Sequence, residues 1–316
     1  MRRSPASYCS HSSTCCTYQV EHFLLPLRQD AEGTDGVKEW FCANTSRPVF
    51  SLGPQLPASY LNAKGGDRFE EPPTSRSEVR ISYFNSQETA GDKSDTSIIF
   101  LNNALKKYGA KSVLYITFGS LMVPELARVG YLLDVLLELE EPMPFLFTTA
   151  STAMHISDSI REKVATTGRG LLVPWAPQQA VLEHPATGWA VSHCGAGGIT
   201  ESLAQGIPLI AWPVGAEQPS NARWVSEVLD TAFELLQVRA RLGHNKAFRG
   251  GPNGTEIVGT EEAIKAEMKD VLTRARGEEG RRKRANAGKV QQLIREALVP
   301  GGQVDEHFEL LNKEIM

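Results

Sequence analysis

Apolar positions follow two alternating patterns through the middle of the chain. Short continuous apolar runs are typical of parallel strands that are buried on both faces. Between them, apolar residues recur every three or four positions, which is typical of helices with one buried side. The expected strands are residues 113–118, 145–149, 170–173, 188–192 and 207–212, and the expected helices are 94–109, 124–140, 198–205 and 217–229. Strands that alternate with helices predict an α/β fold with a doubly wound parallel sheet.

The first expected helix carries a signal at each end. Ser94 or Asp95 can cap its N-terminus, and Gly109 can end it. The last part of the chain, residues 260–316, is predicted to be helical and strongly charged. We interpret its basic run, Arg281–Arg284, as a solvated helix face; a nuclear signal and a phosphate-binding patch are the alternatives.

The N-terminal part has a different composition. Residues 1–46 begin with a stretch rich in Ser, Thr, Cys and Arg, and residues 54–95 contain many Pro, Gly and charged positions. These compositions favour segments with little regular structure. We therefore expect an unassigned, disordered or aberrant N-terminus at 1–46, a linker segment at 47–93 and one folded domain at 94–316.

Charge and cysteine content exclude several classes of protein. Lys and Arg number 33 against 37 Asp and Glu, so the net charge of −4 argues against a nucleic-acid binder. No apolar run reaches the roughly 18 residues of a membrane-spanning helix. Four of the five cysteines fall within the first 42 residues, without the spacing of a zinc site or of a secreted disulfide framework. The expectation is a cytoplasmic protein with reduced thiols and no metal.

A glycine-rich turn follows the strand expected at 188–192. His193 stands at the carboxyl end of the strand, Gly195, Gly197 and Gly198 follow, and a helix is expected to open near Ile199. Glycines allow close approach of a ligand to the backbone, and a helix N-terminus favours phosphate. The alternative is a turn that needs glycines only for tight packing. The pattern is neither a Walker loop nor GxGxxG, so a nicotinamide-dependent oxidoreductase is a weak alternative.

Polar and aromatic residues that suit a nucleotide follow or flank the neighbouring strands. Trp175 can stack on a base or simply pack, and Glu201, expected in the first helical turn, can bind a ribose diol or complement the helix dipole. Glu217 and Gln218 follow the strand at 207–212, where they can contact sugar hydroxyls. In open α/β sheets, ligands bind at this carboxyl edge.

Taken together, residues 175–218 resemble the donor-binding signature of the family 1 UDP-glycosyltransferases. The residues that carry the resemblance are Trp175, Pro177, Gln178, Leu182, His184, Gly188, His193, Gly195, Glu201, Gly206, Pro208, Pro213, Glu217 and Gln218. Similarity extends to residues 112–120 and 297–302, and more weakly to 47–54, which resembles the interdomain segment of the family. The resemblance implies the Rossmann-like C-terminal domain of a GT-B glycosyltransferase.

For the nucleoside, the resemblance implies four contacts. Trp175 would stack on uracil, and the backbone of Ala176 would pair with its edge. Gln178 and Glu201 would hold the ribose.

For the diphosphate and the sugar, the resemblance implies a second set. His193, Ser120 and the backbone of Gly195 would bind the diphosphate, while Glu217 and Gln218 would contact the sugar hydroxyls.

The sequence also departs from the family pattern at this site. Plant members usually have Trp, Asn and Ser where this chain has Ala196, Gly197 and Gly198. Backbone N–H groups at Gly197 and Gly198 would then replace side-chain contacts. Glu217 stands where Asp is usual, which leaves the identity of the sugar open.

The implied reaction is inverting transfer of a hexose from a UDP-sugar to the hydroxyl of a small lipophilic acceptor, without a cofactor or a metal. In the family, an N-terminal domain binds the acceptor and supplies a catalytic His. Only about 46 residues precede the interdomain-like segment, and His22 lacks the Gly-His context of that base. The catalytic base therefore stays unidentified. The alternative is a catalytically incomplete UDP-sugar-binding fragment, or one subunit of a split enzyme whose partner chain supplies the acceptor half.

Overall fold

A computed structural model describes residues 95–119, 124–149, 156–239, 246–247 and 253–315. The predicted segments 1–46 and 47–93 lie outside these residues, so their boundaries stay predictions. The chain divides into two compact units, and the sheet with its covering helices lies within the unit that spans Pro57–Gly288.

Six of the described strands form one parallel sheet, in the order β3-β2-β1-β4-β5-β6. Their bounds are β1 Val113–Thr117, β2 Phe145–Thr148, β3 Gly170–Val173, β4 Thr187–Ser192, β5 Leu209–Ala211 and β6 Ala232–Glu234. This is the doubly wound Rossmann order. Successive strands are added toward one edge of the sheet from β1 to β3 and toward the other edge from β4 to β6, so the strand order reverses between β1 and β4. The predicted fold class is confirmed, although β6 was not among the expected strands. Two further short strands, β7 Lys246–Ala247 and β8 Thr255–Glu256, form an antiparallel pair.

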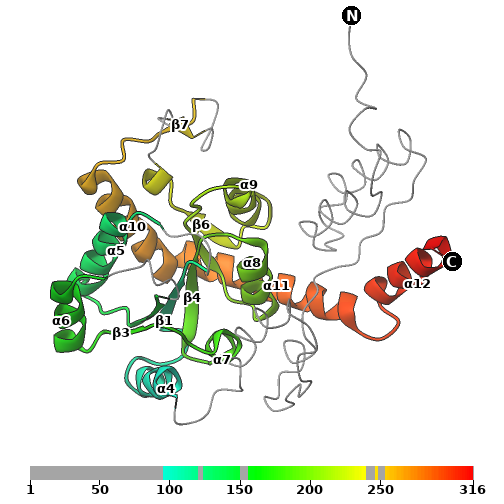
Figure 1. Ribbon diagram of the computed structural model, residues 1–316, viewed down its shortest axis with the longest axis horizontal. Coiled ribbons are helices and arrows are strands. Elements are labelled where there is room, and N and C mark those ends of the chain that lie inside the picture. The colour runs from blue at the N-terminus through cyan, green and yellow to red at the C-terminus, as the bar shows by residue number, and fades with distance from the viewer. Residues whose placement is uncertain (1–94, 120–123, 150–155, 240–245, 248–252, 316) are drawn as a thin grey trace, which may run out of the picture. The chain divides into compact units, whose positions relative to one another are not determined.

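Helices cover both faces of the sheet (Figure 1). On one face α5 packs against α6 and α10, and on the other α4 packs against α7, which in turn contacts α8. Their bounds are α4 Thr96–Tyr108, α5 Leu126–Glu138, α6 Asp158–Thr167, α7 Gln178–Glu183, α8 Ala196–Ala204 and α10 Glu261–Arg276. Between β5 and β6 lie α9 Gln218–Arg223 and the π-helical turn Trp224–Val228. The last two helices are α11 Glu278–Leu298 and α12 Gln303–Ile315.

The main core fills the side of the sheet that faces α5 and α10. Leu114, Ile116 and Phe118, from β1 and the residue after it, are at most 1% exposed and pack with apolar residues of both helices. Side chains alternate along a strand, so Tyr115 faces the opposite side. The continuous apolar run at 113–118 is therefore explained by burial on both faces.

Several helix boundaries differ from the expectation. Asp95 caps α4 by accepting from the backbone N–H of Ser97 at 2.7 Å, and Gly109 ends it, as predicted. By contrast, α8 begins at Ala196 rather than near Ile199, so Gly197 and Gly198 lie in its first turn. Glycine has a low helix propensity, which hides a helix start from sequence reasoning. The helices α6 and α7 were not predicted.

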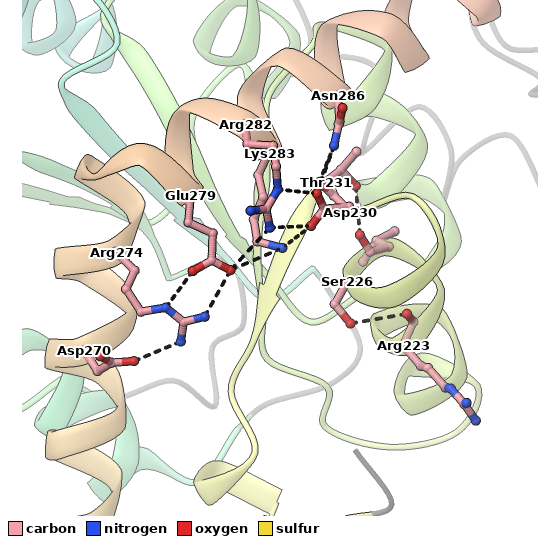
Figure 2. A network of polar contacts seen from close by, with 11 residues as sticks. Arg223, Ser226, Asp230, Thr231, Asp270, Arg274, Glu279, Arg282, Lys283 and Asn286 are labelled. Carbon is pink, nitrogen blue, oxygen red and sulfur yellow. Dashed lines mark hydrogen bonds and ion pairs between the residues drawn. The ribbon is translucent and has the colours of Figure 1, made fainter. Parts of the chain in front are cut away.

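The interpretation of the basic run as a solvated helix face was wrong for Lys283 and Arg284, whereas Arg282 is exposed. Lys283 is only 4% exposed, and its ammonium group lies 2.6 Å from an oxygen of Asp230. Arg282 pairs with the same carboxylate at 2.7 Å, as Figure 2 shows. Arg284 donates to the carbonyl oxygen of Gly188 at 2.5 Å. Because Asp230 and Gly188 lie at the amino ends of β6 and β4, this part of the run anchors α11 to the amino edge of the sheet.

None of the described helices is both long enough and apolar enough to cross a membrane.

Candidate functional site

The predicted site residues that the structure describes gather at the carboxyl edge of the sheet. Because all six strands are parallel, their carboxyl ends meet along one edge. The segments that follow β1, β4 and β5 lie there as neighbours, since β4 pairs with both β1 and β5. The strand order reverses between β1 and β4. Open α/β sheets bind their ligands in a crevice at such a switch point.

His193 lies at this switch point, between two glycines. A Cβ built on Gly119, which follows β1, would meet Cε1 of His193 at 2.7 Å. A Cβ built on Gly195 would meet Nε2 of His193 at 2.5 Å. Real Cβ atoms essentially never come this close, so both positions need glycine for the ring to keep its place. Gly119 also has a φ of +69°, in the left-handed region that glycine tolerates best.

The surroundings of His193 favour the uncharged form of its imidazole. Burial lowers the pKa of His193 from its ordinary 6.5, and the negative charge of Glu217 opposes this only in part. Within the described part of the chain, its buried Nδ1 atom has no hydrogen-bond partner. Buried polar atoms normally have one, so an unpartnered nitrogen at a ligand crevice favours a group that arrives with a ligand.

The N-terminus of α8 opens directly beside His193. Gly195 is its N-cap residue and, among the described residues, no side chain caps this end. The first-turn N–H groups of a helix carry partial positive charge and can bind an anion. A Cβ on Gly197 would meet nothing within 4 Å, so the helix start is open on that side.

The turn between β4 and α8 is held from two sides. Cys194 is fully buried, has a φ of 64° and donates its backbone N–H to Oγ of Ser192 at 3.1 Å. From α9, the buried Asn221 donates its side-chain amide to the carbonyl oxygen of Cys194 at 2.9 Å. A non-glycine residue with positive φ persists only where its surroundings hold it. Asn221 thereby ties the turn after β4 to the helix that follows β5.

Gln178 and Glu201 form a hydrogen-bonded pair across two helices. The amide Nε2 of Gln178, the first residue of α7, donates to Oε2 of Glu201 on α8. Both side chains are half-buried. The expectation that Glu201 lies in the first helical turn was wrong, since α8 starts earlier and has no acidic residue there. Glu201 is therefore too far along the helix to complement the dipole, and its position favours a role in binding.

Trp175 and Ala176 lie in the segment between β3 and α7, at the same carboxyl edge. Trp175 is half-buried, whereas Ala176 is 3% exposed. Pro177 then occupies the N-cap position of α7, with Gln178 directly after it. The indole of Trp175 is thus partly exposed and is not one of the fully buried residues of the core.

Glu217 and Gln218 differ in their surroundings although they are adjacent. Glu217 is exposed at the start of α9. Gln218 is 3% exposed, and its Oε1 accepts the backbone N–H groups of Val214 at 2.8 Å and Gly215 at 3.0 Å. The oxygen of Gln218 thus stabilises the turn after β5, and only its amide nitrogen stays available to donate to a ligand. Ser120, the remaining predicted site residue, lies outside the described residues.

Comparisons with known proteins match this part of the chain to one family. The family model described as UDP-glucoronosyl and UDP-glucosyl transferase matches residues 100–240, which include the switch point and every predicted site residue. UDP-glycosyltransferase eriJ of Hericium erinaceus is 38% identical over 178 residues, which cover 56% of this chain. Residues 100–240 of the chain thus match the UDP-glycosyltransferase family.

Other members of the family match in sequence and in structure. An anthocyanidin 3-O-glucosyltransferase of Zea mays is 33% identical over 65% of this chain. The solved structure of a UDP-glucosyltransferase of Polygonum tinctorium, capable of glucosylating indoxyl, has a TM-score of 0.60 at 25% identity and covers 89% of this chain. The chain spans only 34% and 38% of the two curated relatives and 52% of that structure.

In the part of the chain that the structure describes, no cluster of three or more His, Cys, Asp and Glu side chains could hold a metal ion. The N-terminal cysteines lie outside the described residues.

Sequence reasoning missed two residues that shape this candidate site. They are Asn221, which supports the turn after β4, and Tyr115, whose hydroxyl donates to Oε1 of Gln178 at 3.1 Å. A hydroxyl within a buried apolar run is a signal for Tyr115, because a buried O–H group needs a partner. Asn221 gives no comparable signal, since its partner is a backbone carbonyl.

Proposed function

We propose that this chain binds a UDP-sugar at the carboxyl edge of its sheet and forms the donor-binding half of a glycosyltransferase. The observation that carries the proposal is the position of His193 between Gly119 and Gly195, beside the uncapped start of α8. A neutral imidazole N–H and a helix N-terminus together suit a diphosphate. The family match supports UDP as the nucleotide.

The nucleoside would lie along the segments on the other side of His193. Trp175 stacks on uracil, and the backbone of Ala176 meets the edge of the base. The Gln178–Glu201 pair accepts the ribose hydroxyls, because a carboxylate is an acceptor and a vicinal diol supplies two donors. Ser120 adds a hydroxyl to the diphosphate.

The reaction that fits this site is transfer of a hexose to a hydroxyl of a small acceptor. The acceptor oxygen attacks C1 of the sugar, the bond from C1 to the β-phosphate oxygen breaks, and UDP leaves with the electron pair. His193 and the N–H groups of Ala196, Gly197 and Gly198 stabilise the charge that develops on UDP. The acceptor loses its proton to a base that is not assigned to any described residue.

Glu217 and Gln218 favour a neutral hexose. The exposed carboxylate of Glu217 accepts hydrogen bonds from sugar hydroxyls, and a uronic acid would place a second negative charge near it. Gln218 contributes only its amide nitrogen, since its oxygen already accepts two backbone N–H groups.

Calorimetry with UDP and uridine tests these roles. His193→Ala should lower the affinity for UDP at least tenfold and leave the affinity for uridine nearly unchanged, because the proposed partner of His193 is phosphate. A hydrogen bond to a charged group contributes about 1.5–3 kcal/mol. Glu201→Ala should lower the affinity for both ligands, because the proposed partner of Glu201 is the ribose. The matched control is His184→Ala, another half-buried histidine, which lies before β4 at the opposite edge of the sheet and should leave UDP affinity unchanged.

The outcomes separate the readings of the chain. Loss of UDP affinity in His193→Ala and not in His184→Ala supports the donor site. Equal affinity in wild type and His193→Ala overturns the phosphate role. Release of UDP from UDP-glucose in the presence of a flavonol would show that the chain is a transferase rather than a fragment that only binds the donor. A chain that is inactive alone but becomes active when it is mixed with an acceptor-domain chain would be one subunit of a split enzyme.

A further inference from the structure

Tyr115 connects the Gln178–Glu201 pair to the buried face of the sheet. It lies on β1, is 1% exposed, and faces the side covered by α7 and α8, because its neighbours Leu114 and Ile116 fill the core on the other side. Its hydroxyl is 3.1 Å from Oε1 of Gln178. A chain of three side chains therefore runs from the sheet to the carboxylate at the crevice.

The chemistry of the three groups fixes the direction of each hydrogen bond. An ionised Glu201 can only accept, so the amide nitrogen of Gln178 must face it. The amide oxygen of Gln178 then faces Tyr115, which has to donate. Burial raises the pKa of Tyr115 to about 12, against the hydroxyls of Thr148 and Thr117, which lower it. Tyr115 thus keeps its proton at neutral pH.

We propose that Tyr115 is a positioning residue for the ribose subsite. Its hydroxyl holds the Gln178 amide in a single orientation, in which the amide nitrogen donates to Glu201. The carboxylate of Glu201 is then held in place to accept hydrogen bonds from a vicinal diol. The inference rests on the proposed function, since the diol is the ribose of the UDP-sugar. Tyr115 does not touch the ligand; it acts through Gln178.

The physical reason is the freedom of an amide that lacks this partner. Without the Tyr115 hydroxyl, the Gln178 amide can rotate or turn its oxygen toward Glu201, and two acceptors would then face each other. Fixing a rotamer-rich side chain on binding costs conformational entropy, and a side chain that is already fixed avoids this cost. Tyr115 therefore contributes to affinity only when the ligand carries the ribose hydroxyls.

The test compares UDP with 2′,3′-dideoxy-UDP by calorimetry on the intact chain. In wild type, the ratio of the two dissociation constants measures what the ribose hydroxyls contribute. Tyr115→Phe should lower this ratio at least threefold, and Gln178→Leu should lower it as well, because it removes the middle of the same chain. The matched control is Tyr131→Phe, a half-buried tyrosine on α5 at the other face of the sheet, which should leave the ratio unchanged.

A purely structural role for Tyr115 predicts a different result. A partly unfolded variant loses affinity for both nucleotides by the same factor, which cancels in the ratio. A wild-type ratio well above one that is unchanged in Tyr115→Phe overturns the inference and leaves the proposed function intact. Should Tyr115→Phe not fold, an unchanged ratio in Gln178→Leu overturns it equally. Failure of wild type to bind UDP overturns the proposed function itself.

Discussion

The ring of His193 lies so close to Gly119 that a Cβ on that glycine would meet Cε1 at 2.7 Å. Gly119→Ala should therefore displace the ring and lower the affinity for UDP at least tenfold, with a smaller effect on uridine. The positive φ at position 119 would strain an alanine by about 1–3 kcal/mol, so Gly119→Ala should also melt at a lower temperature. Calorimetry and thermal unfolding measure the two effects.

Gly168→Ala is the matched control for Gly119→Ala. Gly168 ends α6 with a φ of 60°, and a Cβ there would meet nothing within 4 Å. It should lower stability through strain alone and leave the affinity for UDP unchanged. Equal affinity for UDP in the two variants would mean that the position of His193 does not depend on Gly119.

Protonation of His193 should destabilise the free protein below neutral pH. Burial holds the pKa of the folded imidazole below the 6.5 of the unfolded chain, so the unfolded state binds more protons in that window. Stability should therefore fall as the pH drops below 6.5, and His193→Gln should show less of this fall. Urea unfolding of both proteins between pH 5 and pH 8 measures the difference, and parallel pH profiles would contradict a buried neutral imidazole.

Glu267 should produce a pH dependence of the opposite sign. Burial raises the pKa of this α10 carboxyl from 4.5 to about 7, although it accepts backbone N–H groups from Leu236 at 2.8 Å and Gln237 at 2.9 Å. The folded state therefore binds more protons between these pH values, and stability is lost as the pH rises through them. The loss amounts to about 3 kcal/mol at ~1.4 kcal/mol per pH unit.

The variant that isolates this effect is Glu267→Gln, which cannot titrate. The difference in free energy of unfolding between wild type and Glu267→Gln should shift in favour of the variant as the pH rises from 4.5 to 8. A difference that stays constant over this range would show that Glu267 titrates normally in the folded state. Glu261→Gln, at the exposed start of the same helix, is the matched control.

Asp230 neutralises the buried ammonium of Lys283 at the amino edge of the sheet (Figure 2). Asp230→Asn keeps a side chain that tolerates the φ of 49° but removes the charge, and leaves Lys283 only the more distant carboxylate of Glu279, at 3.9 Å. The variant should therefore destabilise the protein by at most the cost of an uncompensated buried charge, about 3–5 kcal/mol. Chemical denaturation measures the loss. Lys283→Met in the Asp230→Asn background should recover much of it, and a double variant no more stable than Asp230→Asn would show that the charge of Lys283 is not the cause.

These variants should leave the donor site unaffected. Asp230 precedes β6, whereas the predicted ligand contacts follow the carboxyl ends of their strands. UDP affinity measured below the melting temperature should therefore match wild type, in contrast to His193→Ala and Gly119→Ala.

The sequence by itself determined the first five strands of the sheet, from β1 to β5, and the edge of the sheet that carries the candidate site, although it did not predict α6 and α7. Periodicity is a local property, so the runs at Val113–Thr117 and Gly170–Val173 predict strands without knowledge of their neighbours. The parallel direction of the strands then places His193, Trp175 and Glu217 at one edge. The resemblance over residues 175–218 supplied the family, which the comparisons confirm.

Only the tertiary structure decided which residues support those contacts. Tyr115 is distant in sequence from Gln178 and Glu201, and Asn221 is distant from Cys194, so no local pattern pairs them. The sequence did not predict the start of α8 at Ala196, because Gly197 and Gly198 in its first turn have a low helix propensity. It also predicted a solvated helix face at 281–284, because the partner of Lys283, Asp230, lies far away in the sequence. Local sequence encodes propensity and amphipathicity, whereas hydrogen bonds and ion pairs between distant elements exist only once the sheet has brought those elements together.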